Sequence, residues 1–210
     1  MNAMENIYIC LAAPLLLAIL CLRREGRRTL IFLLTGMTVC LLSAYVSAFA
    51  ADLMMRDYAF AAYEITPAVE ESLKFLPVLF YLLVFAPERD HAVSGTLLVS
   101  VGFATFENVC FLTSYGTDQL LRVAVRGFGT GAMHVVCGTA VAVELFLLWD
   151  RNWLRLAGTM GVLCFVITFH AVFNICVDQT GAVFAAAAAI PLILLLLYLF
   201  FIHPWIKNRE

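Results

Sequence analysis

Long apolar runs alternate with short polar segments along almost the entire chain. Seven of these runs are about long enough to cross a bilayer as helices, which takes ~20 mostly apolar residues. They are residues 7–22, 30–50, 63–86, 92–114, 123–149, 154–177 and 182–202. Charged residues, prolines or glycines separate one run from the next. The pattern therefore predicts an all-α protein, a polytopic transmembrane helix bundle with about seven spanning helices.

Composition agrees with a membrane location. The chain is 63% hydrophobic and 13% charged, whereas soluble domains contain about 45–50% apolar and roughly 25% charged residues. A net charge of -2 without any basic tract argues against a nucleic-acid partner. The lipid bilayer is the expected surrounding. No segment between the runs is long enough for a second folded unit, so residues 1–210 are predicted to form one membrane domain.

The basic residues predict how the bundle is oriented. If the first polar segment is cytoplasmic, one set of basic residues lies inside: Arg23, Arg24, Arg27, Arg28, Arg89, Arg151, Arg155, Lys207 and Arg209. The outside then receives only Arg56, Arg122 and Arg126, the last near the outer mouth of its helix. Cytoplasmic flanks of membrane helices carry an excess of Lys and Arg. We therefore expect a multi-pass protein of the cell membrane, with the N-terminus outside and the C-terminus in the cytoplasm.

The third run carries three charged residues into the predicted membrane interior. They are Glu70, Glu71 and Lys74, at the head of an otherwise apolar helix. Ionisable groups within a bilayer are costly and usually functional. Either glutamate can meet Lys74, since their spacings are i, i+4 and i, i+3. Pairing one glutamate leaves the other available for chemistry, although a buried ion pair that only locks helix packing is the alternative.

Polar residues recur in the next three runs: Glu107 and Asn108, then Arg126 and His134, then His170 and Asn174. With the orientation above and a rise of ~1.5 Å per residue, Glu70, Glu107 and His170 lie roughly 10 Å below the outer surface, and His134 about 15 Å. Four helices are thus expected to bring carboxylates and imidazoles to one layer. Polar contacts between membrane helices contribute only ~0.6 kcal/mol on average, so packing alone is a weak reason for this concentration.

Two histidines and a carboxylate are the ligand set of many hydrolytic zinc sites, where water takes the open position. We therefore predict that Glu107, His134 and His170 bind a divalent metal, with zinc as the first choice. A further glutamate can act as general base towards that water. Glu70 is the predicted base, and Glu71 the partner of Lys74, although the two glutamates could exchange roles.

Three other polar residues complete the predicted site. Asn108 and Asn174 are expected to orient ligands or to stabilise an oxyanion. Arg126 could bind a substrate carboxylate or simply extend towards the membrane surface. A metal-free mechanism is the alternative, in which the glutamates act alone and the histidines polarise the carbonyl or hold the oxyanion.

The order and spacing of these motifs resemble the PrsW family of intramembrane proteases, distant relatives of the CAAX prenyl endopeptidases. The motifs are Glu70-Glu71-x-x-Lys74, Phe103-Ala104-x-x-Glu107-Asn108, Arg126 followed by His134 and Gly138, and His170-x-x-x-Asn174. They cover about Pro67 to Asn174, within a motif-bearing core of about 63–177. Because the CAAX enzymes carry histidine where this chain has Glu107, prenylated substrates are not implied.

The resemblance implies a bacterial membrane endopeptidase of regulated intramembrane proteolysis. Its substrate would be a membrane-anchored protein similar to an anti-sigma factor, cut near the extracytoplasmic side. The residues alone leave two other functions open, a proton-coupled transporter and a non-catalytic membrane scaffold. Intramembrane Glu, His and Lys chains also form proton relays. However, the chain shows neither internal repeats nor paired broken helices, which are typical of transporters.

Overall fold

The fold is described from a computed structural model, which places residues 3–115, 120–202 and 204. These residues are almost entirely helical and include no strand, so the all-α prediction is confirmed. The helices are α1 (Ala3–Cys21), α2 (Arg24–Leu53), α3 (Tyr58–Glu64), α4 (Thr66–Phe85), α5 (Arg89–Tyr115), α6 (Leu120–Leu148), α7 (Asn152–Val177) and α8 (Ala182–Leu197). A short π-helix, Tyr198–Ile202, continues α8.

Six of these helices are long and apolar enough to cross a membrane: α1, α2, α5, α6, α7 and α8. Helix α4 is not among them. It is 20 residues long and mostly apolar, but it carries the charged residues Glu70, Glu71 and Lys74, which are buried inside the bundle. The prediction of about seven spanning helices agrees with this arrangement. The third predicted run differs in one respect, because the structure divides it between α3 and α4.

The break between α3 and α4 has a local cause. Asp57 caps α3 by accepting a hydrogen bond from the Ala59 amide at 2.9 Å. Helix α4 then begins at Thr66, with Pro67 in its first turn. Proline has no N–H to donate and its fixed φ suits the start of a helix, so it favours a new helix here. The glutamates consequently lie in the first two turns of α4.

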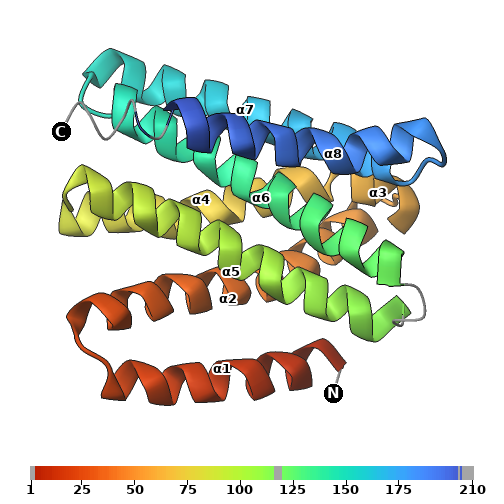
Figure 1. The fold of residues 1–210 in the computed structure, drawn as a ribbon, viewed down its shortest axis with the longest axis horizontal. Coiled ribbons are helices and arrows are strands. Elements are labelled where there is room, and N and C mark those ends of the chain that lie inside the picture. The colour runs from red at the N-terminus through yellow and green to blue at the C-terminus, as the bar shows by residue number, and fades with distance from the viewer. Residues whose placement is uncertain (1–2, 116–119, 203, 205–210) are drawn as a thin grey trace.

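The long helices run antiparallel between two ends of the bundle (Figure 1). At one end lie the start of α1, the α2–α3 connection, the end of α5, the start of α6 and the α7–α8 connection. We call this the N-terminal end. The α1–α2, α4–α5 and α6–α7 connections lie at the other end, which we call the arginine-rich end because it carries Arg23, Arg24, Arg27, Arg28, Arg151 and Arg155. These six arginines, which the sequence assigned to one side of the membrane, thus lie at the same end of the bundle.

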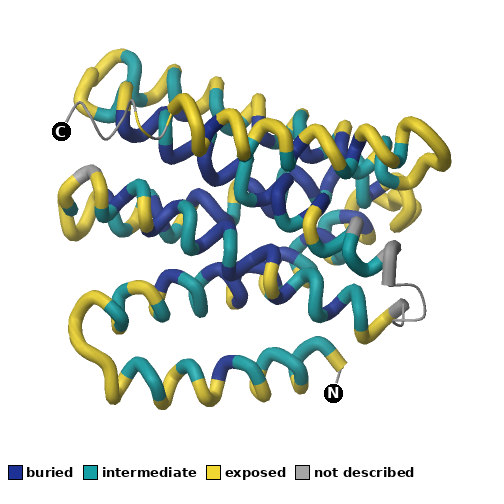
Figure 2. The backbone as a smooth tube through the Cα atoms, in the orientation of Figure 1, coloured by how far each residue is buried: buried dark blue, intermediate teal, exposed yellow. Residues whose placement is uncertain are grey.

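Burial is greatest in the centre of the bundle (Figure 2). Buried residues gather on the facing sides of α2, α4, α5 and α6, whereas α1 has a single buried residue, Ala12. Many large apolar side chains are exposed on the outer faces, including Leu83 on α4 and Leu156 on α7. Such faces suit lipid, because they place apolar surface where a soluble protein would place charge.

Helices α2 and α5 touch along their backbones at two glycines. A methyl group on Gly36 would lie 2.0 Å from the Val99 carbonyl oxygen, and one on Gly102 would lie 2.0 Å from the Leu33 carbonyl oxygen. Small residues permit this close packing of membrane helices. The contact sets the depth of α5 in the bundle and with it the position of Phe103, whose ring is fully buried beside the charged residues of α4.

Candidate active site

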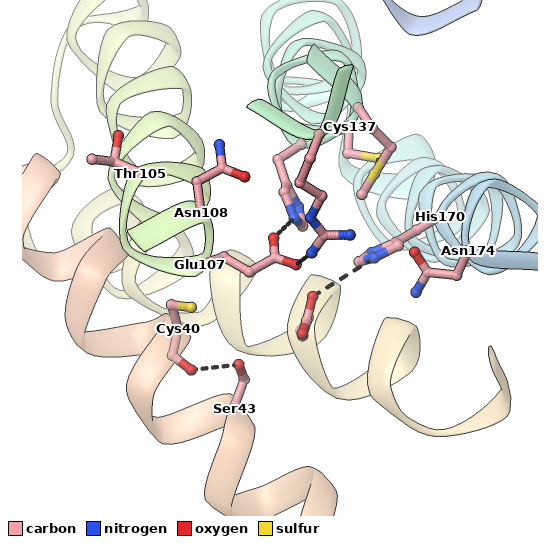
Figure 3. A network of polar contacts seen from close by, with 12 residues as sticks. Cys40, Ser43, Thr105, Glu107, Asn108, Cys137, His170 and Asn174 are labelled. Atoms are coloured by element: carbon pink, nitrogen blue, oxygen red, sulfur yellow. Dashed lines mark hydrogen bonds and ion pairs between the residues drawn. The ribbon is translucent and has the colours of Figure 1, made fainter. Parts of the chain in front are cut away.

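Four helices bring their polar residues together (Figure 3). The residues of α4 and α7 lie near the start of α4 and the end of α7, at the N-terminal end of the bundle. Figure 3 shows Glu107 of α5 pointing towards α6, and His170 of α7 pointing towards a carboxylate of α4. The side chains of Glu70, Glu71, Lys74, His134 and His170 are buried. Glu107 and Arg126 differ, because their side chains are 23% and 22% exposed. They therefore form the side of the site that reaches the surface of the bundle.

Lys74 pairs with Glu71, and not with Glu70 as the alternative spacing allowed. Its Nζ lies 2.6 Å from Glu71 Oε1 and 3.0 Å from His134 Nδ1. The ammonium group also sits 4.9 Å from the centre of the Phe103 ring. Because an ammonium group only donates, the Nδ1 atom of His134 is the acceptor.

This bond determines where His134 carries its proton. With Nδ1 accepting from Lys74, the neutral ring holds its hydrogen on Nε2, which donates to Glu107 Oε2 at 2.5 Å. The other oxygen of Glu107 accepts from Arg126 Nη2 at 2.7 Å. Arg126 in turn packs over the Phe111 ring at 4.5 Å. Both carboxylate oxygens of Glu107 are therefore engaged, one by each of two α6 side chains.

His170 has a different environment. Its Nδ1 atom donates to Glu71 Oε1 at 2.8 Å, because a carboxylate oxygen accepts. Its Nε2 atom therefore keeps a lone pair, and Glu70 Oε2 lies 3.7 Å from it. A histidine held by a carboxylate behind one nitrogen, with the other nitrogen free, is the arrangement found at metal-binding histidines.

The two asparagines serve the helix framework in this structure. Asn108 donates to the Gly127 carbonyl oxygen of α6 at 3.4 Å, and Asn174 donates to the Ala62 carbonyl oxygen of α3 at 3.1 Å. The latter bond ties α3 to α7, together with the hydrogen bond that Tyr63 donates to Asp178. The sequence predicted that both asparagines would orient ligands or stabilise an oxyanion; the bonds found here join neighbouring helices around the site.

The residues present fit a metal ion. Glu70, His134 and His170 each offer a ligand atom, and these atoms all lie within 4.8 Å of one another. Glu70 Oε2 is buried and has no hydrogen-bond partner among the described residues, which is unfavourable for a carboxylate unless a cation lies beside it. Two histidines and a glutamate are a ligand set of catalytic zinc. The sequence proposed Glu107 with the two histidines, whereas the group of neighbouring ligand atoms described here contains Glu70.

A known protein family matches most of the chain. The family model described as "PrsW family intramembrane metalloprotease" matches residues 25–203 of the chain. The chain belongs to this family. It is a multi-pass membrane protein and a metal-dependent peptidase, as the sequence predicted. The match covers more of the chain than the motifs do, since it includes α2 and α8. No curated protein and no solved structure matches the chain.

Phe103 is a residue of this PrsW-family peptidase to which sequence reasoning gave no role. Its ring is 4.9 Å from Lys74 Nζ, and its centre is also 4.9 Å from the centre of the His134 ring. It therefore contacts both groups with a ring that is fully buried. Its spacing was the available signal, because Phe103 lies one helical turn before Glu107 and therefore shares its face of α5.

Proposed function

We propose that this peptidase hydrolyses a peptide bond of a membrane-anchored protein, similar to an anti-sigma factor, near the extracytoplasmic side. The observation that carries the proposal is the position of the metal-binding trio. Two of its members, Glu70 near the start of α4 and His170 near the end of α7, lie towards the N-terminal end of the bundle and away from the arginine-rich end. Basic residues mark the cytoplasmic side of membrane proteins, which supports an extracytoplasmic site, an outer N-terminus and a cytoplasmic C-terminus. Residues 1–210 would act as one domain, since the site draws on four helices of one bundle.

Glu70, His134 and His170 would hold a divalent metal, with zinc as the expected ion. When bound, such an ion polarises the scissile carbonyl and makes a water molecule nucleophilic near neutral pH. His170 is ready for this role, because Glu71 fixes its free nitrogen towards Glu70. His134 would bind a cation through Nε2 only as the tautomer that carries its hydrogen on Nδ1, so that hydrogen would have to move from Nε2 to Nδ1 and Lys74 would stop donating there. Because the ring keeps one hydrogen in this exchange, Glu107 would remain a carboxylate.

Glu107 is then the general base of the proposed mechanism. It is the site glutamate whose side chain is partly exposed, so it can reach a water molecule that approaches with the substrate. Glu71 is committed to Lys74 and His170. Arg126 holds Glu107 from the mouth of the site and can donate to the substrate's carbonyl oxygen. This proposal exchanges the roles that the sequence suggested for Glu70 and Glu107.

Two isosteric variants test the assignment. Glu70→Gln removes a ligand, so both bound metal and activity should be lost. Glu107→Gln should retain metal and lose activity by ~10²–10⁴-fold, the usual contribution of a general base. Elemental analysis and cleavage of a single-pass test substrate provide the two measurements. Loss of metal from Glu107→Gln with retention in Glu70→Gln would restore the original assignment, with Glu70 as base and Glu107 as ligand.

Orientation and substrate class are tested separately. A single cysteine introduced at Thr180, in the α7–α8 connection, should react with an impermeant reagent in intact cells. One at Glu88, in the α4–α5 connection, should react only after the membrane is opened. The segment between the fourth and fifth predicted runs is also expected outside, but residues 116–119 lie outside the described residues, so Thr180 is the labelling site. Comparing membrane proteomes with wild type and Glu107→Gln should reveal single-pass proteins that lose their outer segments only with wild type.

A further inference from the structure

A small polar cavity lies directly behind the proposed site, on the side of the arginine-rich end. Glu71, Lys74, Thr96, Ser100 and Gly138 line it, together with Phe75 and Val141. The volume accessible to the centre of a water molecule is about 10 Å³. A single water requires roughly 10–15 Å³ by this measure and two to four polar partners. The cavity therefore has the size and the lining for one water molecule.

Lys74 lines this cavity and has one hydrogen-bond donor more than the described residues accept. An ammonium group has three N–H donors, and Glu71 and His134 accept two of them. Among the described residues no further acceptor is bonded to it. A buried donor left without a partner is costly, by about 1–3 kcal/mol and more for a charged group. An oxygen atom in the cavity would accept the third proton.

Two hydroxyl groups on α5 can complete the coordination of such an oxygen. Thr96 Oγ1 donates its hydrogen to the Ala92 carbonyl oxygen at 2.8 Å, so its lone pairs remain free to accept. Ser100 lies one turn further along α5, is buried, and faces the same cavity. Thr96 and Ser100 thus offer an acceptor and a second polar group on the side opposite Lys74.

Helix α6 makes room for this arrangement at Gly138, one turn after His134. A methyl group at Gly138 would lie 2.2 Å from Ser100 Oγ, so the hydroxyl occupies space that any other residue would fill. Close packing of α5 and α6 would be possible without a hydroxyl here. Gly138 therefore leaves space for the hydroxyl group of Ser100, which α5 places in the interface with α6.

We propose that one ordered water molecule binds in this cavity, accepting a hydrogen bond from Lys74 and donating to Thr96 Oγ1 and Ser100. The water holds the Lys74 ammonium group in line with His134 Nδ1 and Glu71, and so maintains the orientation of both histidines. Thr96 and Ser100 are positioning residues for the reaction. The role of Thr96 and Ser100 in turnover rests on the proposed function, whereas the binding of the water does not.

Two substitutions at Thr96 separate this role from simple packing. Thr96→Val keeps the size of the side chain and removes the acceptor, whereas Thr96→Ser keeps the acceptor and removes a methyl group. We expect Thr96→Val to lower kcat by ~10-fold, the low end of the cost for groups behind metal ligands, with KM unchanged. Thr96→Ser should remain close to wild type. A packing role predicts the reverse order, and that result would overturn the positioning role.

Thr105→Val is the matched control. Thr105 also lies on α5 and donates to the carbonyl oxygen four residues earlier, Val101, at 2.7 Å, but its side chain is exposed and points away from Glu107 (Figure 3). The variant makes the same chemical change without touching the cavity, so its kcat should equal that of wild type. An equal loss in Thr105→Val and Thr96→Val would assign the effect to the lost helix hydrogen bond.

The water itself is tested without any peptidase assay. An experimental structure at a resolution that shows ordered waters should contain a peak within hydrogen-bond distance of Lys74 Nζ, Thr96 Oγ1 and Ser100 Oγ. The peak should be missing from Thr96→Val. Its absence from wild type would overturn the proposal, even if the protein proved an active peptidase. If the peak is present and wild type cleaves no substrate, the proposed function fails and the water site stands.

Discussion

His134 and His170 are two buried histidines whose ring centres lie 5.0 Å apart, yet the groups behind them have opposite charge. Glu71 accepts from Nδ1 of His170, which leaves its Nε2 lone pair free beside Glu70. Lys74 donates to Nδ1 of His134, which places a hydrogen on its Nε2, facing Glu107. The α7 side of the site is thus prepared for a cation, whereas on the α6 side the His134 ring must first move its hydrogen from Nε2 to Nδ1. One ion pair, Glu71 with Lys74, produces both states.

The largest expected effect comes from removing either histidine. His134→Ala and His170→Ala should each abolish bound metal and activity, because three protein ligands are the minimum of a catalytic zinc site. Thr168→Ala is the control on α7, since this exposed threonine bonds only within its helix. Elemental analysis and substrate cleavage measure the outcome. A fully active, metal-replete His134→Ala protein would show that only the α7 side binds the ion.

Removing Lys74 should have the next largest effect, and we expect it mainly on the stability of the fold. Lys74→Met leaves Glu71 buried without its cation, and breaking a buried pair in this way costs about 3–5 kcal/mol. The double variant Glu71→Gln with Lys74→Met removes both charges and should recover much of the lost stability. Thermal unfolding in detergent provides the comparison. A double variant no more stable than Lys74→Met would indicate that the pair is not the source of the loss.

Arg126→Lys should have a moderate effect confined to activity. The substitution keeps the positive charge near Glu107 but loses the planar fork that fixes the carboxylate and packs on Phe111. Because this ion pair is partly exposed, its contribution is no more than about 1 kcal/mol, or ~5-fold in rate. Bound metal should stay at the wild-type level. A loss of metal from Arg126→Lys would instead place Glu107 among the ligands.

The smallest effect is expected at Asn174. Its bond goes to the Ala62 carbonyl oxygen of α3 and so lies outside the two histidine environments. Asn174→Ala should cost about 1 kcal/mol of local stability, the usual value of one hydrogen bond. Hydrogen exchange should therefore speed up in α3 while metal affinity is retained. The sequence alone suggested that Asn174 orients His170, and a ~10–100-fold loss of metal affinity would support that role after all.

Much of the site was predictable from helical periodicity and charge. The spacing of Glu70, Glu71 and Lys74 placed three charges on neighbouring positions of one helix, and the arginine distribution brought His134, His170 and Glu107 to one level. The motifs in their order identified the family, which is confirmed over residues 25–203. These features follow from sequence because the rise and turn of a helix are nearly constant.

Which atoms meet was decided only by the tertiary structure. Lys74 could reach either glutamate along α4, and the positions of His134 on α6 and His170 on α7 select Glu71. The same packing of helices places Glu70 beside His170 and lets Arg126 donate a hydrogen bond to Glu107.

The cavity lined by Thr96, Ser100 and Gly138 likewise depends on neighbours distant in the chain, because residues of α4, α5 and α6 form it together. Periodicity determines which face of a helix a residue occupies. A hydrogen bond or a metal ligand requires distances set to within a few tenths of an ångström, and these depend on how closely the helices pack.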